Sequence, residues 1–332
     1  MNVLVTGGMG YIGSHTCVEL TNIGHNPIII DNLSNSKPEV QDKIEKITGK
    51  RPVFYEGDVA DKSLLNKIFT DNKIEAVIHF AGYKAVGESV EKPLMYYRNN
   101  IGNTVALCEV MTEFNCKNII FSSSATVYGA PKSVPINEDF ELHCTNPYGR
   151  TKYMIEEILR DLYISDNTWN ITLLRYFNPI GAHDSGLIGE DPQGIPNNLM
   201  PYIMKVALGE LPCLNVFGND YNTHDGTGVR DYIHVVDLAK GHIKALENLN
   251  GMSVYNLGTG TGYSVLDLVK AFEKENNIKV PYEIKGRRPG DIDSCFANPD
   301  KALKELGWKA ELNVEQMCSS VWKYAQNYIN KK

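Results

Sequence analysis

The sequence predicts an α/β protein, in which a doubly wound parallel sheet is followed by a second, smaller α/β lobe that binds substrate. Through the first half of the chain, short apolar segments alternate with helical patterns, as in a parallel sheet covered on both faces. After about Asn178 this alternation weakens and Gly, Pro, Asn and Asp become abundant. We therefore expect one domain over 1–178 and another over 179–332, with the option that segments near 230–260 return to the first.

The elements follow in order along the chain. The expected strands are continuous apolar runs, at residues 3–6, 27–30, 52–55, 76–80, 118–122 and 171–177. The expected helices have apolar residues three and four positions apart, at residues 12–20, 40–47, 64–68, 93–114, 147–166, 235–248 and 266–275. Residues 181–200 and 218–230 are expected to be long loops, which often bind substrate.

Composition limits the classes of partner. The chain has 332 residues and a formal net charge of -7, which disfavours non-specific binding to nucleic acid or to an anionic membrane. Its seven cysteines are odd in number, and their spacing matches neither a zinc nor a redox motif. A signal peptide and a run of about 20 apolar residues are both missing from the sequence. We expect a cytoplasmic protein without a metal site.

A glycine loop joins the first expected strand to the first expected helix. Gly7, Gly10 and Gly13 would let the backbone approach a pyrophosphate at the N-terminus of that helix. Asp31 ends the second strand, where a carboxylate can accept both adenosine ribose hydroxyls and would repel a 2′-phosphate. Together, the glycines and Asp31 favour a dinucleotide-binding loop over a simple tight turn, and NAD over NADP as the dinucleotide. Asp58 fits either an adenine contact or a helix N-cap.

A serine, a tyrosine and a lysine form a second candidate site. Ser124 follows the fifth strand, and Tyr148 and Lys152 are four residues apart on one helix face. A tyrosine has a pKa of about 10, so a phenolate at neutral pH requires roughly 4 kcal/mol of electrostatic stabilisation. Lys152 and an oxidised nicotinamide would each supply one positive charge, and Ser124 could hold the same substrate hydroxyl. The alternative is an ordinary surface Tyr/Lys pair.

This ordered set resembles the extended short-chain dehydrogenase/reductase superfamily, whose nucleotide-binding domain is of Rossmann type. Longer motifs in both lobes resemble the UDP-glucose (UDP-galactose) 4-epimerase family, and they cover residues 80–89, 122–129, 174–179, 189–201, 226–235 and 287–291. The resemblance implies an isomerase that retains NAD. Tyr148 would take the proton of the sugar 4-hydroxyl while hydride passes from carbon 4 to NAD. The 4-keto sugar would then turn over and receive the hydride on its other face.

The resemblance also implies roles for individual residues. The implied catalytic residues are Tyr148, Lys152 and Ser124. The implied NAD contacts are Gly7, Gly10, Tyr11, Ile12, Gly13, Asp31, Asn32, Asn35, Ser36, Asp58, Val59, Phe80, Ala81, Lys84, Asn99, Ser124, Tyr148, Lys152 and Phe177. The implied UDP-sugar contacts are Lys84, Ser124, Tyr148, Asn178, Asn198, Leu199, Asn215, Phe217, Arg230, Arg288, Asp291 and Cys295. The two arginines suit a diphosphate, because a guanidinium offers paired donors.

One position departs from part of the family. Cys295 stands where some bacterial members carry a tyrosine that closes the hexose pocket. Members with a small residue there tend to accept N-acetylated sugars. We therefore hypothesise activity on UDP-N-acetylglucosamine and UDP-N-acetylgalactosamine as well.

Several rival functions differ in what they require. A sugar-nucleotide 4,6-dehydratase uses an Asp-Glu pair at the positions of Ala125 and Thr126, which cannot act as acid and base. A UDP-glucuronate-type epimerase would need a basic contact for the sugar carboxylate, and this alternative stays open. A net dehydrogenase would release NADH, and a cofactor-sensing regulatory protein would not need Tyr148 and Lys152.

The family commonly forms a homodimer through a four-helix bundle, which implies an interface on helices 93–114 and 147–166. Apolar residues on these helices fit an interface and core packing equally well: Met95, Leu107, Met111, Met154, Ile155 and Ile158.

Overall fold

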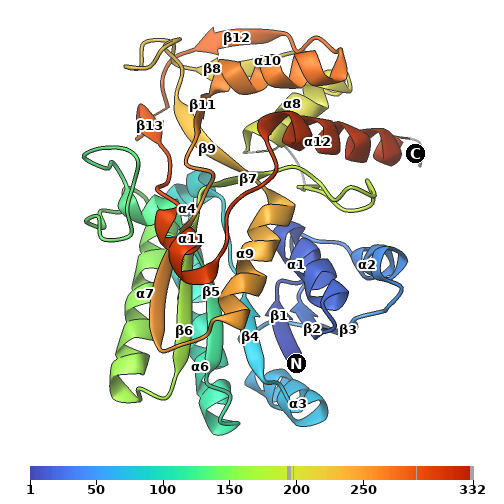
Figure 1. Ribbon diagram of the computed structural model, residues 1–332, viewed down its shortest axis with the longest axis vertical. Coiled ribbons are helices and arrows are strands. Elements are labelled where there is room, and N and C mark those ends of the chain that lie inside the picture. The colour runs from blue at the N-terminus through green and yellow to red at the C-terminus, as the bar shows by residue number, and fades with distance from the viewer. Residues whose placement is uncertain (193–195, 197, 289, 330–332) are drawn as a thin grey trace.

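The computed structural model describes residues 1–192, 196, 198–288 and 290–329, which form a lower lobe around a large sheet and an upper lobe above it (Figure 1). The large sheet has seven strands in the order β10-β6-β5-β4-β1-β2-β3, and all its pairings are parallel. These strands are β1 (Asn2–Thr6), β2 (Asn26–Asp31), β3 (Val53–Glu56), β4 (Ala76–His79), β5 (Asn118–Ser124), β6 (Asn170–Tyr176) and β10 (Met252–Leu257). The predicted Rossmann-type doubly wound fold is confirmed.

Helices cover both faces of this sheet. The larger helices of the lower lobe are α1 (Tyr11–Asn22), α2 (Val40–Thr48), α3 (Lys62–Asn72), α6 (Gly102–Glu113), α7 (Pro147–Ser165) and α9 (Val235–Glu247). Shorter helical segments are α4 (Val86–Glu91), η2 (Ala125–Tyr128) and α11 (Asp300–Leu306). On one face, α1 and α9 pack against each other, with α2 beside α1. The other face buries side chains of α3, α6 and α7 against the same strands.

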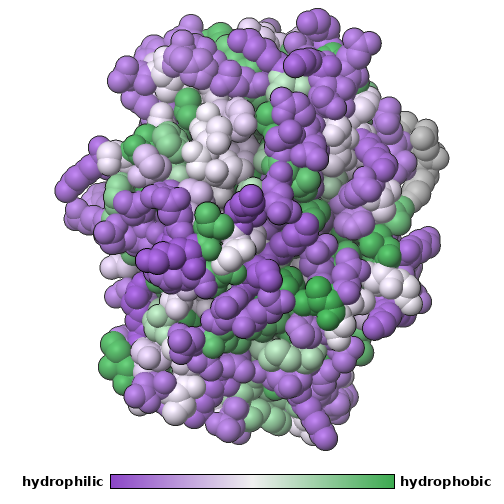
Figure 2. Space-filling model, in the orientation of Figure 1, coloured by the Kyte–Doolittle hydropathy of each residue, from purple (hydrophilic) through white to green (hydrophobic). Residues whose placement is uncertain are grey.

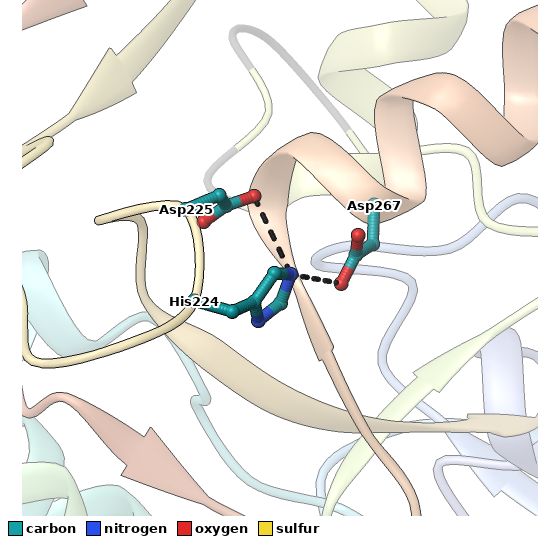
Figure 3. A group of neighbouring side chains, drawn as sticks. All are labelled: His224, Asp225 and Asp267. Atoms are coloured by element: carbon teal, nitrogen blue, oxygen red, sulfur yellow. Dashed lines mark ion pairs between the residues drawn. The ribbon is translucent and has the colours of Figure 1, made fainter.

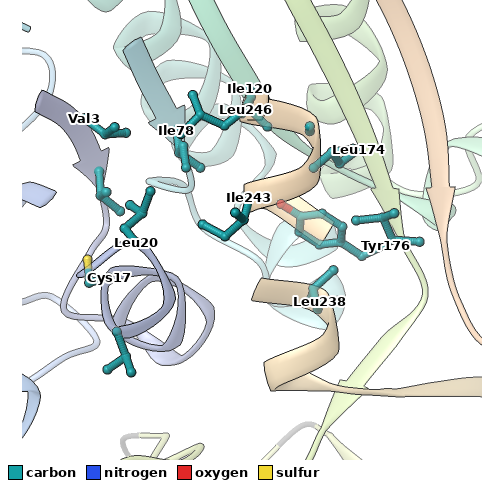
Figure 4. Close-up of a cluster of buried hydrophobic side chains, with 14 of the residues drawn as sticks. Val3, Cys17, Leu20, Ile78, Ile120, Leu174, Tyr176, Leu238, Ile243 and Leu246 are labelled. Carbon is teal, nitrogen blue, oxygen red and sulfur yellow. The ribbon is translucent and has the colours of Figure 1, made fainter. Parts of the chain in front are cut away.

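Two strands in the middle of the sheet show why it is apolar along its whole length. Val3 and Ile78 lie under α1 and α9, in the cluster of Figure 4 that also holds Leu20 and Ile243. Leu4 and Val77, the next residue of β1 and the preceding residue of β4, face the opposite cluster. Successive side chains of a strand point to opposite faces, so a sheet covered twice needs apolar residues at every position.

The helix predicted over 93–114 is interrupted. It consists of α5 (Pro93–Tyr96), a π-helical segment η1 (Tyr97–Ile101), and then α6. Within η1, the buried Asn100 amide donates to Thr151 Oγ1 on α7 at 3.0 Å and to the Tyr83 carbonyl at 3.1 Å. Asn100 makes these contacts with distant segments at the point where the α-helical hydrogen-bond pattern is interrupted. The spacing of apolar residues in the sequence does not reveal such an interruption.

The upper lobe is smaller and combines short strands with three longer helices. Its elements are β7 (Asn178–Ile180), α8 (Leu199–Ala207), β8 (Leu214–Phe217), β9 (Val229–His234), β11 (Gly262–Ser264), α10 (Val265–Asn276), β12 (Tyr282–Lys285), β13 (Ser294–Cys295) and α12 (Val314–Ile329). They share a separate core of side chains from α8, α10 and α12. Although β10 is late in the chain, it pairs with β6 in the large sheet. The expected division at residues 178 and 179 stays a prediction.

The surface agrees with an ordinary folded domain. The face in Figure 2 is mostly hydrophilic, with small, separate hydrophobic patches. Within the part of the chain that the structure describes, no helix has the length and apolar character needed to cross a membrane.

Replacing Ile78 by Ala tests the importance of the packed sheet. Ile78 is fully buried in β4, so Ile78→Ala should lower the free energy of unfolding by about 2–5 kcal/mol. The matched change Ile164→Ala, at a side chain that is 78% exposed on α7, should have little effect. Thermal or urea unfolding of both variants measures the difference. Equal effects would contradict this account of the core.

Candidate active site

The loop between β1 and α1 requires its glycines. Gly7 has φ +70°, which favours glycine. A Cβ atom on Gly13 would lie 2.3 Å from the Gly7 carbonyl oxygen, so the first turn of α1 can pack on the loop only without a side chain. Gly10 is the N-cap and offers no side-chain acceptor to the first N–H groups of α1. These N–H groups and the helix dipole make the loop a site for a phosphate group.

Asp31 is held beside this loop at the end of β2. Its carboxylate is 8% exposed and accepts hydrogen bonds from the Met9 N–H at 3.0 Å and the Ser36 hydroxyl at 2.8 Å. A carboxylate fixed at this point can accept ribose hydroxyls next to a phosphate on the helix. The donor groups and the close approach of the backbone therefore fit a dinucleotide such as NAD.

Other expected NAD contacts gather along the carboxyl edge of the sheet. Asn32 Nδ2 donates to Asp58 Oδ2 at 3.1 Å, while Asp61, and not Asp58, caps α3. Ala81 N–H, just after β4, donates to Thr6 Oγ1 at 3.1 Å. Further members are placed as follows: Tyr11 and Ile12 open α1, Asn35 is exposed after β2, Val59 is buried after β3, Phe80 follows β4, Asn99 lies in η1, and Phe177 is buried after β6.

The structure brings the predicted Ser-Tyr-Lys set together at the carboxyl end of β5 and the start of α7. Lys152 Nζ lies 6.0 Å from the centre of the Tyr148 ring and donates to the Ser122 carbonyl oxygen at 2.5 Å. Ser124 hydrogen-bonds with Tyr148, and its Oγ accepts from Thr126 Oγ1 at 2.9 Å. The Asn146 side chain caps α7 by accepting from the Gly149 N–H, which fixes the turn that presents Tyr148.

Burial controls the charges at this set. Loss of water raises the pKa of Tyr148, and the hydrogen bond with Ser124 opposes that rise. Burial lowers the pKa of Lys152 to about 7, while the nearby Glu156 carboxylate opposes that fall. Lys152 can therefore gain or lose its proton near neutral pH, whereas Tyr148 ionises there only with help from a nearby positive charge. Such a pair can take up and return a proton.

The upper lobe supplies two groups of expected UDP-sugar contacts. Arg288 stacks over the Phe217 ring at 3.9 Å, and Phe217 shares β8 with Asn215. Arg230 on β9 donates to Asp291 Oδ1 at 3.4 Å and to the Ile292 carbonyl at 3.0 Å. Asn178 is exposed at the start of β7, which pairs with β9.

Cys295 lies where the upper lobe meets the η2 segment of the lower lobe. It pairs with Arg230 through β13 and β9, and it packs against the cluster that contains Ala125 and Phe177. Burial raises the pKa of its thiol to about 11, so the thiol stays protonated at neutral pH. Cys295 is therefore an uncharged group at this position.

A contact between the lobes was missed by sequence reasoning. Lys84 Nζ and Asn198 Nδ2 both donate to Glu190 Oε1, at 3.1 Å and 2.7 Å, and Leu199 then begins α8. Lys84 and Asn198 were expected to contact ligand, whereas here each also bonds the same carboxylate. The motif over 189–201 contains Glu190 but does not reveal its partners. Residues 193–195, 197 and 289 of the expected motifs lie outside the described residues.

A separate histidine-aspartate cluster belongs to the upper-lobe loops. Candidate ligand atoms of His224, Asp225 and Asp267 lie within 4.8 Å of one another (Figure 3). Asp225 accepts from both Thr227 N–H and the Ser264 hydroxyl, and Asp267 completes the capping box of α10. These bonds stabilise a turn and the N-terminal end of α10, which accounts for the position of both carboxylates.

Comparison with known proteins identifies the family. A family model described as GDP-mannose 4,6 dehydratase matches residues 4–321. The chain is 61% identical over 333 residues to a UDP-glucose 4-epimerase of Bacillus subtilis, which covers 99% of this chain and 98% of the relative. The human UDP-glucose 4-epimerase is 56% identical, with 97% and 95% covered. This chain belongs to the UDP-glucose 4-epimerase family.

A solved structure agrees along the whole length. The UDP-glucose 4-epimerase of Bifidobacterium longum, in complex with NAD+ and UDP, has a TM-score of 0.97 and 55% identity, and each chain is fully covered. The expected family, fold and NAD dependence are thereby confirmed. The family model bears the name of a dehydratase, but Ala125 and Thr126 lie in η2 directly after Ser124, where neither side chain can supply acid or base.

Replacing Gly13 by Ala should weaken retention of NAD. The added methyl carbon would lie 2.3 Å from the Gly7 carbonyl oxygen, so the loop must move. We expect at least a tenfold loss of affinity, or about 1.4 kcal/mol. The matched change Gly102→Ala, where an added Cβ meets open space, should leave NAD content unchanged. Titration of apoprotein with NAD measures both, and equal affinities would refute the close-packed loop.

Proposed function

We propose that this chain is an NAD-dependent UDP-sugar 4-epimerase, an isomerase that interconverts UDP-galactose and UDP-glucose by transient oxidation at sugar carbon 4. The carrying observation is the pair of half-buried Tyr148 and buried Lys152 beside Ser124, at the edge of the sheet where the glycine loop opens. The near full-length identity to UDP-glucose 4-epimerases supports the same reaction.

The chain's own residues provide the proton transfer. Tyr148, as phenolate, takes the proton of the sugar 4-hydroxyl, and Ser124 holds that hydroxyl in place. The Lys152 ammonium stabilises the phenolate while the proton is absent. NAD, when bound, supplies the acceptor and later the donor of hydride for carbon 4. Tyr148 then returns the proton to the 4-oxygen on the inverted carbon, so protons and electrons balance over the cycle.

The upper lobe would hold the nucleotide while the hexose turns. Arg230 and Arg288 suit the two phosphates, because each guanidinium presents several donors. Asp291 can accept ribose hydroxyls of uridine, and its contact with Arg230 keeps both beside the same ligand. Binding energy placed on UDP, remote from carbon 4, lets the sugar rotate without leaving.

We further propose that N-acetylated UDP-sugars are substrates. Cys295 occupies the position at which some family members carry a tyrosine, and its packing against the cluster that contains Ala125 and Phe177 supports a role beside the hexose. A cysteine leaves room for an acetamido group that a tyrosine ring would fill.

A homodimer is the proposed assembly. Leu107, Met111 and Ile155 are buried in the lower-lobe core, so they are not available for an interface. Met154 on α7 is 43% exposed and Leu94 on α5 is 79% exposed. Because α5 packs against α7, these apolar side chains can form one dimer surface.

The cytoplasm is the proposed location. All seven cysteines are free thiols, as expected in a reducing compartment, and Cys17, Cys108, Cys116 and Cys318 are buried.

Replacing Tyr148 by Phe tests the reaction. Purified protein without added NAD should convert UDP-galactose to UDP-glucose, as resolved by proton NMR. Tyr148→Phe removes the proton acceptor, so kcat should fall by about 10²-fold or more. Tyr163→Phe, on the same helix, should retain full activity. Conversion by Tyr148→Phe at the wild-type rate would exclude this tyrosine as the base, and failure of the wild type even with NAD would exclude the proposed reaction.

Replacing Cys295 by Tyr tests the sugar specificity. The wild type should interconvert UDP-N-acetylgalactosamine and UDP-N-acetylglucosamine, whereas Cys295→Tyr should lose this activity and keep that on UDP-galactose. The ratio of kcat/KM for the two substrates is the measurement. A wild type inactive on N-acetylated sugars would refute the pocket argument.

A further inference from the structure

A buried ion pair lies beneath the Tyr148–Lys152 site. Arg175 on β6 donates from Nη2 to Glu156 Oε2 at 2.6 Å and from Nε to Glu156 Oε1 at 3.0 Å. The Glu156 side chain is 0% exposed and that of Arg175 is 2% exposed. Arg175 Nη1 also donates to Tyr128 Oη and to the Glu138 carbonyl oxygen. The pair is therefore rigidly held and shielded from water.

The pair and the active site share two elements. Tyr148, Lys152 and Glu156 follow one another at four-residue intervals on α7, which places them along one helix face. On β5, Ser122 accepts from Lys152 Nζ through its carbonyl, and the next residue, Ser123, donates from Oγ to Glu156 Oε1 at 2.5 Å. One strand segment thus fixes the cation of the site and the anion below it.

The remaining titratable groups around this face are mostly neutral. They include His79 on β4, Tyr96 on α5, Tyr128 on η2 and Tyr176 on β6, with Glu88 on α4, Arg160 on α7 and the half-buried Glu138, which faces Arg175. Burial lowers the pKa of His79 to about 3 and raises the pKa of each of these tyrosines, to about 12 for Tyr128. Glu88 bonds Lys92 nearer the surface, and Arg160, 35% exposed, pairs with Glu157 at 3.3 Å and more distantly with Glu156 Oε2 at 3.8 Å. Among the described residues of this face, the fully buried charges are therefore Lys152, Glu156 and Arg175, with the half-buried Glu138 and Arg160 beside the ion pair.

We propose that Glu156 and Arg175 are positioning residues for the epimerisation, because their ion pair sets the electrostatic potential at Lys152 and Tyr148 and hence the pH range of activity. The inference rests on the proposed function. Stability alone is a weak reason for such a pair, because well-packed apolar residues often serve a core equally well. A paired carboxylate below Lys152 favours the ammonium form, while the guanidinium prevents the same carboxylate from opposing the Tyr148 phenolate.

The charges of Glu156 and Arg175 have opposite effects on the pKa values of Lys152 and Tyr148, so removing each should shift these pKa values in opposite directions. Losing the Glu156 charge leaves Arg175 uncompensated, so the pKa values of Lys152 and Tyr148 should both fall. Losing the Arg175 charge leaves the carboxylate with Arg160, 3.8 Å away and 35% exposed, as its weaker partner, so both pKa values should rise. Glu156 lies one helical turn from Lys152 and two from Tyr148 on α7, and the Arg175 guanidinium is bonded to it, so shifts on the order of one pH unit are expected.

The experiment is the pH dependence of kcat for UDP-galactose, measured on NAD-loaded protein. Glu156→Gln keeps the shape of the side chain and should move the profile to lower pH. Arg175→Gln should move it to higher pH. The double variant should return the profile to within a few tenths of a unit of the wild type. A merely structural pair would lower stability or rate without moving the profile in opposite directions.

Two controls separate charge from folding. Glu157→Gln removes the same charge from the neighbouring, 52% exposed side chain of α7, and its profile should match the wild type. Arg175→Lys keeps the positive charge but loses the paired geometry, so it should lower thermal stability without an alkaline shift. If Arg175→Gln does not fold, the comparison of Glu156→Gln with Glu157→Gln decides the question.

An unchanged profile in Glu156→Gln, or shifts in the same direction in both single variants, would overturn the proposal. Activity of the wild type and of Glu157→Gln on UDP-galactose would still uphold the proposed function. Inactivity of both, with NAD supplied, would instead reject the proposed function itself.

Discussion

The charge of one buried lysine is the constraint on which the site depends. Lys152 is 5% exposed, and its ammonium donates to a backbone carbonyl at the end of β5 and lies over the Phe121 ring at 4.8 Å. An isolated charge in such a place is costly, and burial lowers its pKa to about 7 even though the Glu156 carboxylate opposes the fall. The sheet, α7 and the nearby carboxylate together keep a cation next to Tyr148. Burial disfavours the charged form of Lys152, but it also strengthens the interaction of that charge with Tyr148, since few water molecules screen it.

The two lobes differ in the part of an epimerase reaction for which their residues are suited. The glycine loop and Asp31 form a rigid cradle, because Gly13 packs against the loop and Asp31 is bonded from two sides. The upper lobe presents arginines on short strands and loops. Glu190 joins the lobes by accepting bonds from Lys84 and Asn198. A firm hold on both nucleotides and a looser hexose site suit a reaction in which the sugar turns while its carrier stays bound.

Much of this could be predicted from the sequence, because the relevant signals are local. Apolar runs locate the strands, the glycine spacing marks the loop, and the four-residue interval places Tyr148 and Lys152 together. Contacts between distant segments were not accessible. The π-helical turn at Asn100, the pairing of β10 with β6, and the meeting of Glu156 with Arg175 all depend on sheet register and helix packing. In hindsight, Arg175 carried a signal, as a charged residue inside an otherwise apolar strand.

The most direct test of the central claim is the ionisation of Tyr148 with and without the lysine charge. Ultraviolet difference absorbance against pH, on NAD-loaded protein, isolates Tyr148 as the component absent from Tyr148→Phe. Lys152 Nζ lies 6.0 Å from the centre of the Tyr148 ring, and two unit charges about 6 Å apart at an effective dielectric constant of about 20 interact by about 2.8 kcal/mol. Lys152→Met should therefore raise the pKa of Tyr148 by about two units. An unchanged pKa would show that Lys152 does not stabilise the phenolate and would contradict the account.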